Sequence, residues 1–201
     1  MEDSYLSVNG FFEAIYKEKG SKFLAYLSKV DNEQEVALML KKVKDLHPKA
    51  RHFCYAYSIG INRETSRSND DGEPAGTAGK PIMNQILSAN LKNVFIVVVR
   101  YFGGTLLGTS GLIKAYKLSS EQVIKLADIQ TYFFTKKLEI SFHYIQTNLV
   151  MKLIKDLKIK VLNQEFGEEN FIKVEVNLNT IPKIEKEFLE IGNVRLIFFD
   201  K

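Results

Sequence analysis

One stretch decides how this chain folds, VFIVVVRYFGGTLLGTSG at residues 94–111. Its first six residues are an unbroken apolar run rich in β-branched side chains, which is typical of a strand buried on both faces of a sheet. Arg100 follows at once, and four glycines occupy the rest of the stretch. The stretch therefore predicts a central strand, a glycine-rich turn and a helix that runs from Ser110 to Ala127.

Two elements nearer the N-terminus are predicted from local patterns. Two β-prone runs, 11–17 and 22–30, flank a short connection at 18–21 that contains a glycine, and this arrangement predicts a β-hairpin. A helix is predicted next, from the N-cap Asn32 to the stop at His47, because apolar residues recur at helical intervals between them.

The segment between this helix and the central strand divides into three parts. Large and small side chains alternate over residues 53–61, which predicts a strand with something packed closely on its small-residue face. Residues 62–80 have no large aliphatic or aromatic side chain, and we expect an exposed loop without regular structure, either functional or disordered. Pro81 suits the first turn of a helix that continues to Leu91.

The alternating pattern restarts at Thr135 and completes a second set of elements. Strands are predicted over 138–144, 160–166, 171–178 and 194–199, and helices over 149–157 and 180–191. The order βαββαβ is the plan of a ferredoxin-like domain. We therefore predict two domains, residues 1–132 and 133–201, with a boundary near 130–135.

Composition and charge exclude several classes of protein. The formal net charge is only +4, so any nucleic-acid footprint must be local. Cys54 is the single cysteine, which fits a reducing compartment and argues against a disulfide or a structural zinc site. The acidic start lacks the apolar region of a signal peptide, and the longest apolar run is too short to span a membrane. We expect a cytoplasmic protein with no membrane partner.

The segment GTAGKP at 76–81 superficially resembles a phosphate-binding loop. A Walker A motif needs four residues between its glycines and Ser or Thr after the lysine, whereas here two residues separate the glycines and proline follows the lysine. One interpretation is that Gly76, Thr77 and Gly79 lead into a helix N-terminus whose N–H groups bind an anion. The other is a simple helix entry, and the sequence leaves both open.

Arg100 gives a sharper signal than its glycine-rich surroundings, which lack the GxGxxG spacing of a dinucleotide loop. An arginine at the end of a buried strand needs an acidic partner or a ligand. Asp70, Asp71 and Glu73 could supply the partner. Two interpretations remain: a ligand site built from the two glycine-rich segments, or an internal clamp between Arg100 and a carboxylate that orders the 62–80 segment.

Metal binding and covalent catalysis have less support. The three acids could hold Mg²⁺, but such clusters on solvated loops are common without a metal. Cys54 is interpreted as an inert packing residue, and nothing supports a Cys–His pair with His52 on the same strand face. We assign no catalytic residue, no metal site and no cofactor.

Basic side chains are frequent around the glycine-rich segments, and dispersed charge of this kind suits a phosphate backbone, although ordinary surface lysines give the same pattern. The set comprises Lys49, Arg51, His52, Arg63, Arg67, Lys80, Arg100, Lys114 and Lys117. In the second domain the outward strand positions are predicted to carry no aromatic side chain, so RRM-like base stacking is not indicated. Those positions are Lys137, Glu139, His143, Lys173 and Glu175.

Several ordered motifs resemble the signature segments of the YigZ/IMPACT family. They are KGSKF at 19–23, HPKARH at 47–52 with CYAY at 54–57, DDGEPAGTAGKP at 70–81, and VVVRYFGGTLLG at 97–108 with GLIKAY at 111–116. The resemblance covers residues 17–125. It implies an α+β fold, with an N-terminal domain like a ribosomal-protein domain and elongation-factor domain IV, followed by a ferredoxin-like βαββαβ domain.

The same resemblance implies a role linked to translation. Eukaryotic members regulate translation initiation; bacterial members suggest RNA or ribosome association, and a peptidase-like activity has been proposed for some. We expect a cytoplasmic, translation-linked regulatory protein that binds RNA, the ribosome or a translation-factor protein. The alternative is a peptidase-like hydrolase that uses Asp70, Asp71 or Glu73. The expected anion- and RNA-binding residues are Arg51, His52, Gly76, Thr77, Gly79, Lys80, Arg100, Gly103 and Gly104.

Overall fold

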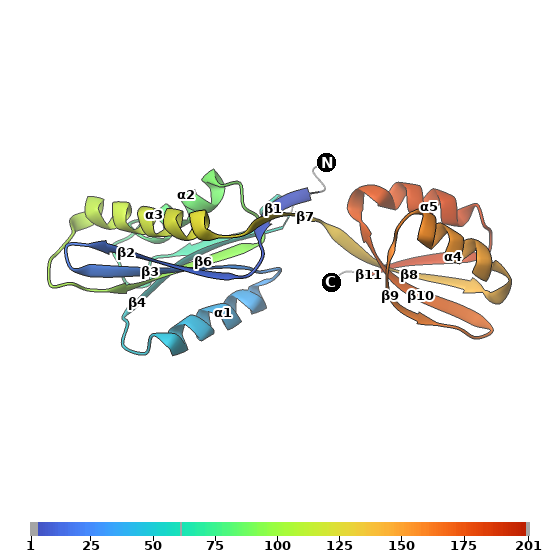
Figure 1. Cartoon of the computed structure of the whole chain (residues 1–201), viewed down its shortest axis with the longest axis horizontal. Helices are drawn as coiled ribbons and strands as arrows, with labels where there is room; N and C mark the ends of the chain where they lie inside the picture. Colours follow the sequence, from blue (N-terminus) through green and yellow to red (C-terminus); the bar gives the residue numbers. More distant parts are fainter. Residues whose placement is uncertain (1–3, 61, 200–201) are drawn as a thin grey trace. The chain divides into compact units, whose positions relative to one another are not determined.

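The computed structural model describes residues 4–60 and 62–199. They form two compact units, one spanning Tyr5–Tyr132 and the other running from Phe133 onward. Both units mix helices with sheets, so the α+β class predicted from the sequence is confirmed (Figure 1). The predicted end of one strand at Ile61 falls outside the described residues.

The sheet of the first unit has five strands, paired antiparallel in the order β2-β3-β6-β4-β5. Their bounds are β2 (Phe11–Glu18), β3 (Ser21–Lys29), β4 (His52–Ile59), β5 (Thr65–Asn69) and β6 (Val94–Tyr101). β6 lies in the middle and is buried as far as Arg100, as predicted. The predicted hairpin is also confirmed, because β2 and β3 pair across a tight turn at Lys19 and Gly20.

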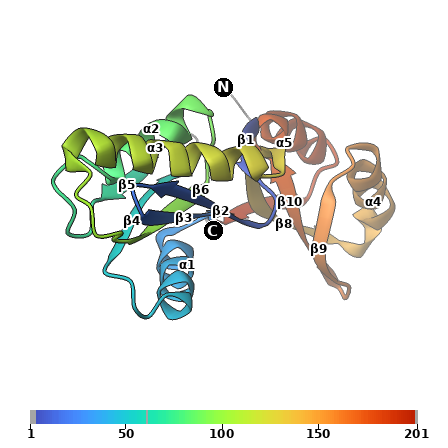
Figure 2. The same ribbon diagram turned by 60° about the vertical axis from the view of Figure 1, so that its left-hand side comes forward.

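Three helices cover this sheet, α1 (Glu33–Leu46) on one face and α2 (Gly79–Ser88) and α3 (Gly108–Leu126) on the other (Figures 1 and 2). α1 begins at its predicted cap, where Asn32 Oδ1 accepts a hydrogen bond from the N–H of Glu35 at 2.9 Å. The predicted alternation of β4 is confirmed as well. Its small residues, such as Cys54, pack in the core beneath α2 and α3, and its large ones, such as Tyr57, pack on the α1 side.

The 62–80 segment is not the exposed, irregular loop that the sequence predicts. Residues 65–69 form β5, which pairs with β4, and Glu73 and Thr77 are buried. The prediction is wrong because the sequence TSRSN has no apolar face, whereas its backbone groups still pair with the neighbouring strand. α2 also begins before Pro81, at Gly79, where an added Cβ would lie 2.7 Å from the backbone nitrogen of Asn69.

A separate two-stranded sheet, which the sequence analysis does not predict, joins β1 (Ser4–Val8) to β7 (Ile129–Phe133). The Asn9 N–H donates to the Asp128 carbonyl oxygen at 2.9 Å just beyond this pair. The two strands come from opposite ends of the first unit, so the contact closes the unit on itself.

The second unit is a four-stranded antiparallel sheet with two helices on one face (Figure 1). Its elements are β8 (Thr135–His143), α4 (Thr147–Asp156), β9 (Lys160–Glu165), β10 (Glu169–Asn177), α5 (Ile181–Leu189) and β11 (Val194–Phe199), with 3₁₀ turns at Tyr144–Gln146 and Leu178–Thr180. The element order βαββαβ and the strand order β11-β8-β10-β9 confirm the ferredoxin-like prediction.

The open face of this second sheet differs from the prediction in one respect. Phe171 and Phe199 lie on it, since they alternate with Ile172 and Phe198 of the core. The face is therefore not free of aromatic side chains. Within residues 4–60 and 62–199, none of the helices is long and apolar enough to cross a membrane.

Candidate functional site

The Asp70 carboxylate fastens the segment that precedes α2. Its Oδ1 accepts hydrogen bonds from the N–H groups of Ala78 at 2.9 Å and Gly79 at 2.8 Å, and its Oδ2 accepts one from Gly76 at 2.8 Å. Burial raises the pKa of the Asp70 carboxyl, but these three donors outweigh it, and the pKa lies below its usual value. Asp70 therefore acts as an internal anion at the N-terminus of α2.

This arrangement changes the interpretation of the 76–80 segment. The N–H groups that the sequence offers to an external anion already bind Asp70, and the Thr77 hydroxyl donates to the Pro74 carbonyl oxygen at 2.7 Å. Lys80 is exposed in the first turn of α2. The glycines of this segment thus shape a turn around the chain's own carboxylate.

Asp70→Asn is expected to lower the free energy of unfolding by about 1–2 kcal/mol at neutral pH, the size of a lost helix cap. Because folding lowers the pKa of Asp70, the stability from its charge is present above the ordinary value of 3.8 and is lost as the pH falls through the folded-state pKa. Denaturant unfolding from neutral pH to about pH 2 should show the difference between wild type and variant closing at acid pH. A difference that stays constant would contradict the charge as its source.

Asp71 and His52 hold the same segment against the start of β4. Asp71 Oδ2 accepts a hydrogen bond from the Phe53 N–H at 2.7 Å, and the Asp71 carbonyl oxygen lies 2.9 Å from His52 Nδ1. A carbonyl oxygen can only accept, so Nδ1 carries the proton. In the part of the chain that the structure describes, Nε2 has no hydrogen-bond partner, and it is the ring nitrogen that a ligand can meet.

Glu73 makes the innermost contact of the three acids. Arg100 Nη1 lies 2.7 and 3.0 Å from its two carboxylate oxygens, and the Tyr116 hydroxyl donates to Oε1 at 2.8 Å. The Arg100 side chain is 8% exposed and the Glu73 side chain 4%. The internal clamp, one of the two interpretations of Arg100, is therefore present in the structure.

Cys54 lies under this cluster, with its thiol 3.2 Å from the Tyr116 hydroxyl and 2.9 Å from the Asp70 carbonyl oxygen. Burial raises the pKa of the thiol, and burial likewise raises the pKa of Tyr116. A buried, protonated thiol is a poor nucleophile. Among the described residues, no group of three or more His, Cys, Asp or Glu side chains is arranged to hold a metal ion.

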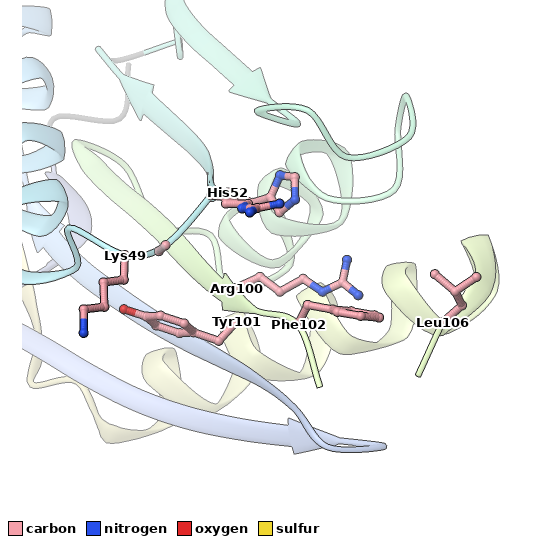
Figure 3. Close-up of a pocket in the computed structure, with 8 residues that line it drawn as sticks. Lys49, His52, Arg100, Tyr101, Phe102 and Leu106 are labelled. Carbon is pink, nitrogen blue, oxygen red and sulfur yellow. The ribbon is translucent and has the colours of Figure 1, made fainter. Parts of the chain in front are cut away.

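An open pocket of about 540 Å³ lies at the end of the sheet where β4 begins and β6 ends (Figure 3). It is lined by Lys49, Ala50, Arg51, His52, Arg100, Tyr101, Phe102 and Leu106, and no acid is among these lining residues. The pocket brings together three residues that the sequence predicts, Arg51, His52 and Arg100. His52 and Arg100 are directly paired neighbours on β4 and β6.

Gly103 and Gly104 do not line the pocket but shape the loop that does. The Gly103 N–H donates to Ser21 Oγ at 3.1 Å, and a Cβ at Gly103 would lie 1.9 Å from the carbonyl carbon of Gly20. Gly104 has a φ of +84°, which favours glycine. The close contact between Gly103 and the β2–β3 turn fixes the position of the loop. It thereby fixes the positions of Phe102 and Leu106, which lie on either side of the two glycines in the sequence.

Comparison with known proteins shows which family the first domain matches. The family model "Impact N-terminal domain" matches residues 19–124, which include every residue that lines the pocket. The chain belongs to the IMPACT family. An IMPACT family member of Haemophilus influenzae is 33% identical over 89% of this chain and 88% of its own length. The IMPACT family member YigZ of Escherichia coli is 33% identical over 91% of this chain and 92% of its own.

One solved structure has the same fold as this chain over its whole length. A crystal structure of a hypothetical protein is 27% identical, covers all of both chains and superposes with a TM-score of 0.77. The likeness extends over the IMPACT domain and the ferredoxin-like domain together.

The structure of this IMPACT family chain also brings to the site residues that the sequence does not single out, among them Lys49, Tyr101, Phe102, Leu106 and Tyr116. Tyr116 belongs to the motif GLIKAY at 111–116, but the sequence does not show that its hydroxyl reaches Glu73. In the structure Tyr116 is buried on α3 and makes this contact. Phe102 and Leu106 are 60% and 84% exposed. Two large apolar side chains beside a glycine pair are a signal that sequence alone could have raised. Lys49 appears only within the basic set.

Proposed function

We propose that this chain is a cytoplasmic, translation-linked regulatory protein that holds the phosphate backbone of RNA, free or in the ribosome, at the pocket. One observation carries the proposal: Lys49, Arg51 and His52 converge with the end of β6 on a pocket whose described lining has no acid. Dispersed cations without competing carboxylates suit phosphodiester oxygens. The family resemblance links such a protein to translation.

We favour RNA binding over hydrolysis because Asp70, Asp71 and Glu73 are engaged in contacts that stabilise the fold. Asp70 caps α2, Asp71 pairs with the start of β4, and Glu73 neutralises Arg100. A general base needs a carboxylate within reach of a bound water or substrate. The contacts of these three acids stabilise the 70–80 segment instead.

Arg51→Glu is expected to weaken binding to total cellular RNA at low ionic strength, because it replaces a phosphate contact with a repulsive charge. The plot of log affinity against log salt concentration should also become shallower, by about 0.7 for each single-strand phosphate that the variant no longer neutralises. Fluorescence anisotropy over a salt series measures both the affinity and this slope.

Lys41→Glu is the matched control, since Lys41 is exposed on α1 outside the pocket and each substitution lowers the formal charge from +4 by two. Equal reductions in affinity for the two variants would show that only net charge matters and would contradict a site at the pocket. No binding by the wild type at low salt would redirect the search to a translation-factor protein.

A further inference from the structure

We propose that the pocket takes an unpaired nucleotide, whose base stacks on Phe102 while Arg51 and His52 contact the neighbouring phosphate. This inference rests on the proposed RNA binding and specifies the form of RNA. Its starting point is an aromatic ring that is 60% exposed next to a group of cations.

The ring of Phe102 is supported from one side. The Arg100 guanidinium carbon lies 5.7 Å from the Phe102 ring centroid and 5.6 Å from that of Phe23, within cation–π distance of both. Glu73 fixes the guanidinium in turn, at 2.7 Å. Arg100 is therefore a positioning residue that holds Phe102 in place, so that little conformational entropy is lost when a second flat group stacks on the ring.

Basic side chains line the same pocket as Phe102. Lys49, Arg51 and His52 line the pocket together with Phe102 and Leu106; Figure 3 labels Lys49 and His52 among these lining residues. His52 is half-buried, and its Nδ1–H is committed to the Asp71 carbonyl oxygen, which leaves Nε2 for a ligand. Nε2 donates to a phosphate oxygen when it too carries a proton. A pocket of about 540 Å³ falls within the usual range for a small ligand or a single nucleotide.

The form of the ligand follows from the exposed ring face. Within a duplex the bases are stacked on one another, and apart from the two terminal pairs their faces cannot reach a side chain. A single strand offers base faces to aromatic rings and phosphates to cations at the same time. An acidic peptide would satisfy the cations but would leave the exposed face of Phe102 in water.

The absence of tryptophan from the chain permits a direct test. Phe102→Trp introduces a single indole at the proposed stacking position, and Phe166→Trp is the control, because Phe166 is 55% exposed in the other domain. The probes are a short mixed-sequence RNA and the blunt duplex that it forms with its complement. The single strand should quench the indole fluorescence of Phe102→Trp, whereas the duplex should not, and Phe166→Trp should respond to neither.

Phe102→Ala supplies a second readout by anisotropy. Its affinity for the single strand should fall by about tenfold, within the range for loss of one base-stacking ring, and its affinity for the duplex should change by less than about twofold. If both RNAs bind, Arg51→Glu abolishes binding and Phe102→Ala changes nothing, the nucleotide inference is overturned while the backbone proposal stands. If neither RNA binds the wild type, both are overturned and the pocket belongs to a protein partner.

Discussion

Arg100→Ala is expected to lower the free energy of unfolding by about 3–5 kcal/mol, the largest effect that we predict for a side-chain truncation in this chain. The substitution leaves the Glu73 carboxylate, 4% exposed, without its cationic partner. An unpaired buried charge is far more costly than a missing surface ion pair. Urea unfolding followed by circular dichroism measures the change in stability.

A double substitution separates the charge from the packing. Arg100→Met together with Glu73→Gln removes both charges, keeps similar volumes and preserves a partner for the Tyr116 hydroxyl. It should restore most of the stability that Arg100→Ala removes, because a buried ion pair is often no better than well-packed neutral groups. A double variant as unstable as the single one would show that the Arg100–Glu73 ion pair itself stabilises the fold, and that the loss in Arg100→Ala is not only the cost of an unpaired carboxylate.

Gly103→Ala is expected to lower the free energy of unfolding by roughly 3 kcal/mol, at the upper end of the cost of overpacking. The added methyl group would meet backbone atoms, at 1.9 Å from the Gly20 carbonyl carbon and 2.1 Å from the Ser21 nitrogen, and neither can rotate away. The loop and the β2–β3 turn must separate to admit it. RNA affinity should fall with stability, because this contact places Phe102.

Gly104→Ala is the control for this prediction, one residue further along the same loop. A Cβ there would meet nothing within 4 Å, so the only penalty is the positive φ, at about 1 kcal/mol. Thermal unfolding of the two variants gives the comparison. Equal destabilisation would mean that the close approach to Gly20 does not constrain the loop.

Most of the fold could be predicted because its elements carry their own periodicity. The apolar run of β6 and the alternation of β4 specify which faces are buried, and the capping residue Asn32 specifies where α1 begins. The second domain is predictable for the same reason, since buried residues alternate with more exposed ones along β10, and the apolar residues Leu138, Ile140 and Phe142 alternate along β8. In these elements the local pattern and the tertiary environment agree.

The elements that were not predicted depend on contacts that no local pattern encodes. β5 is polar and pairs with β4 mainly through its backbone, with one side-chain hydrogen bond from Ser66 to Ser58, and β1 meets β7 from the other end of the first unit. Asp70 illustrates the same limit at the site. The sequence shows three neighbouring acids, but not which one turns back to cap α2 and which one is buried against Arg100.

The residues that line the candidate pocket could be predicted only in part, for a related reason. Arg51, His52 and Arg100 are conspicuous by charge, and strand pairing brings His52 beside Arg100. Lys80 and the glycines of the 76–80 segment look equally suited to an anion in the sequence, but in the structure the donors are occupied by Asp70. The division of the chain into domains at residues 1–132 and 133–201 stays a prediction.

The most direct measurement of the central claim is an amide NMR titration of the full chain with the short single-stranded RNA. The proposed site predicts that the largest chemical-shift changes fall in residues 49–52 and 100–106, and that the ferredoxin-like domain is little affected. Shift changes confined to residues 133–199, or absent from both pocket segments when RNA is bound, would contradict the proposal that this pocket holds RNA.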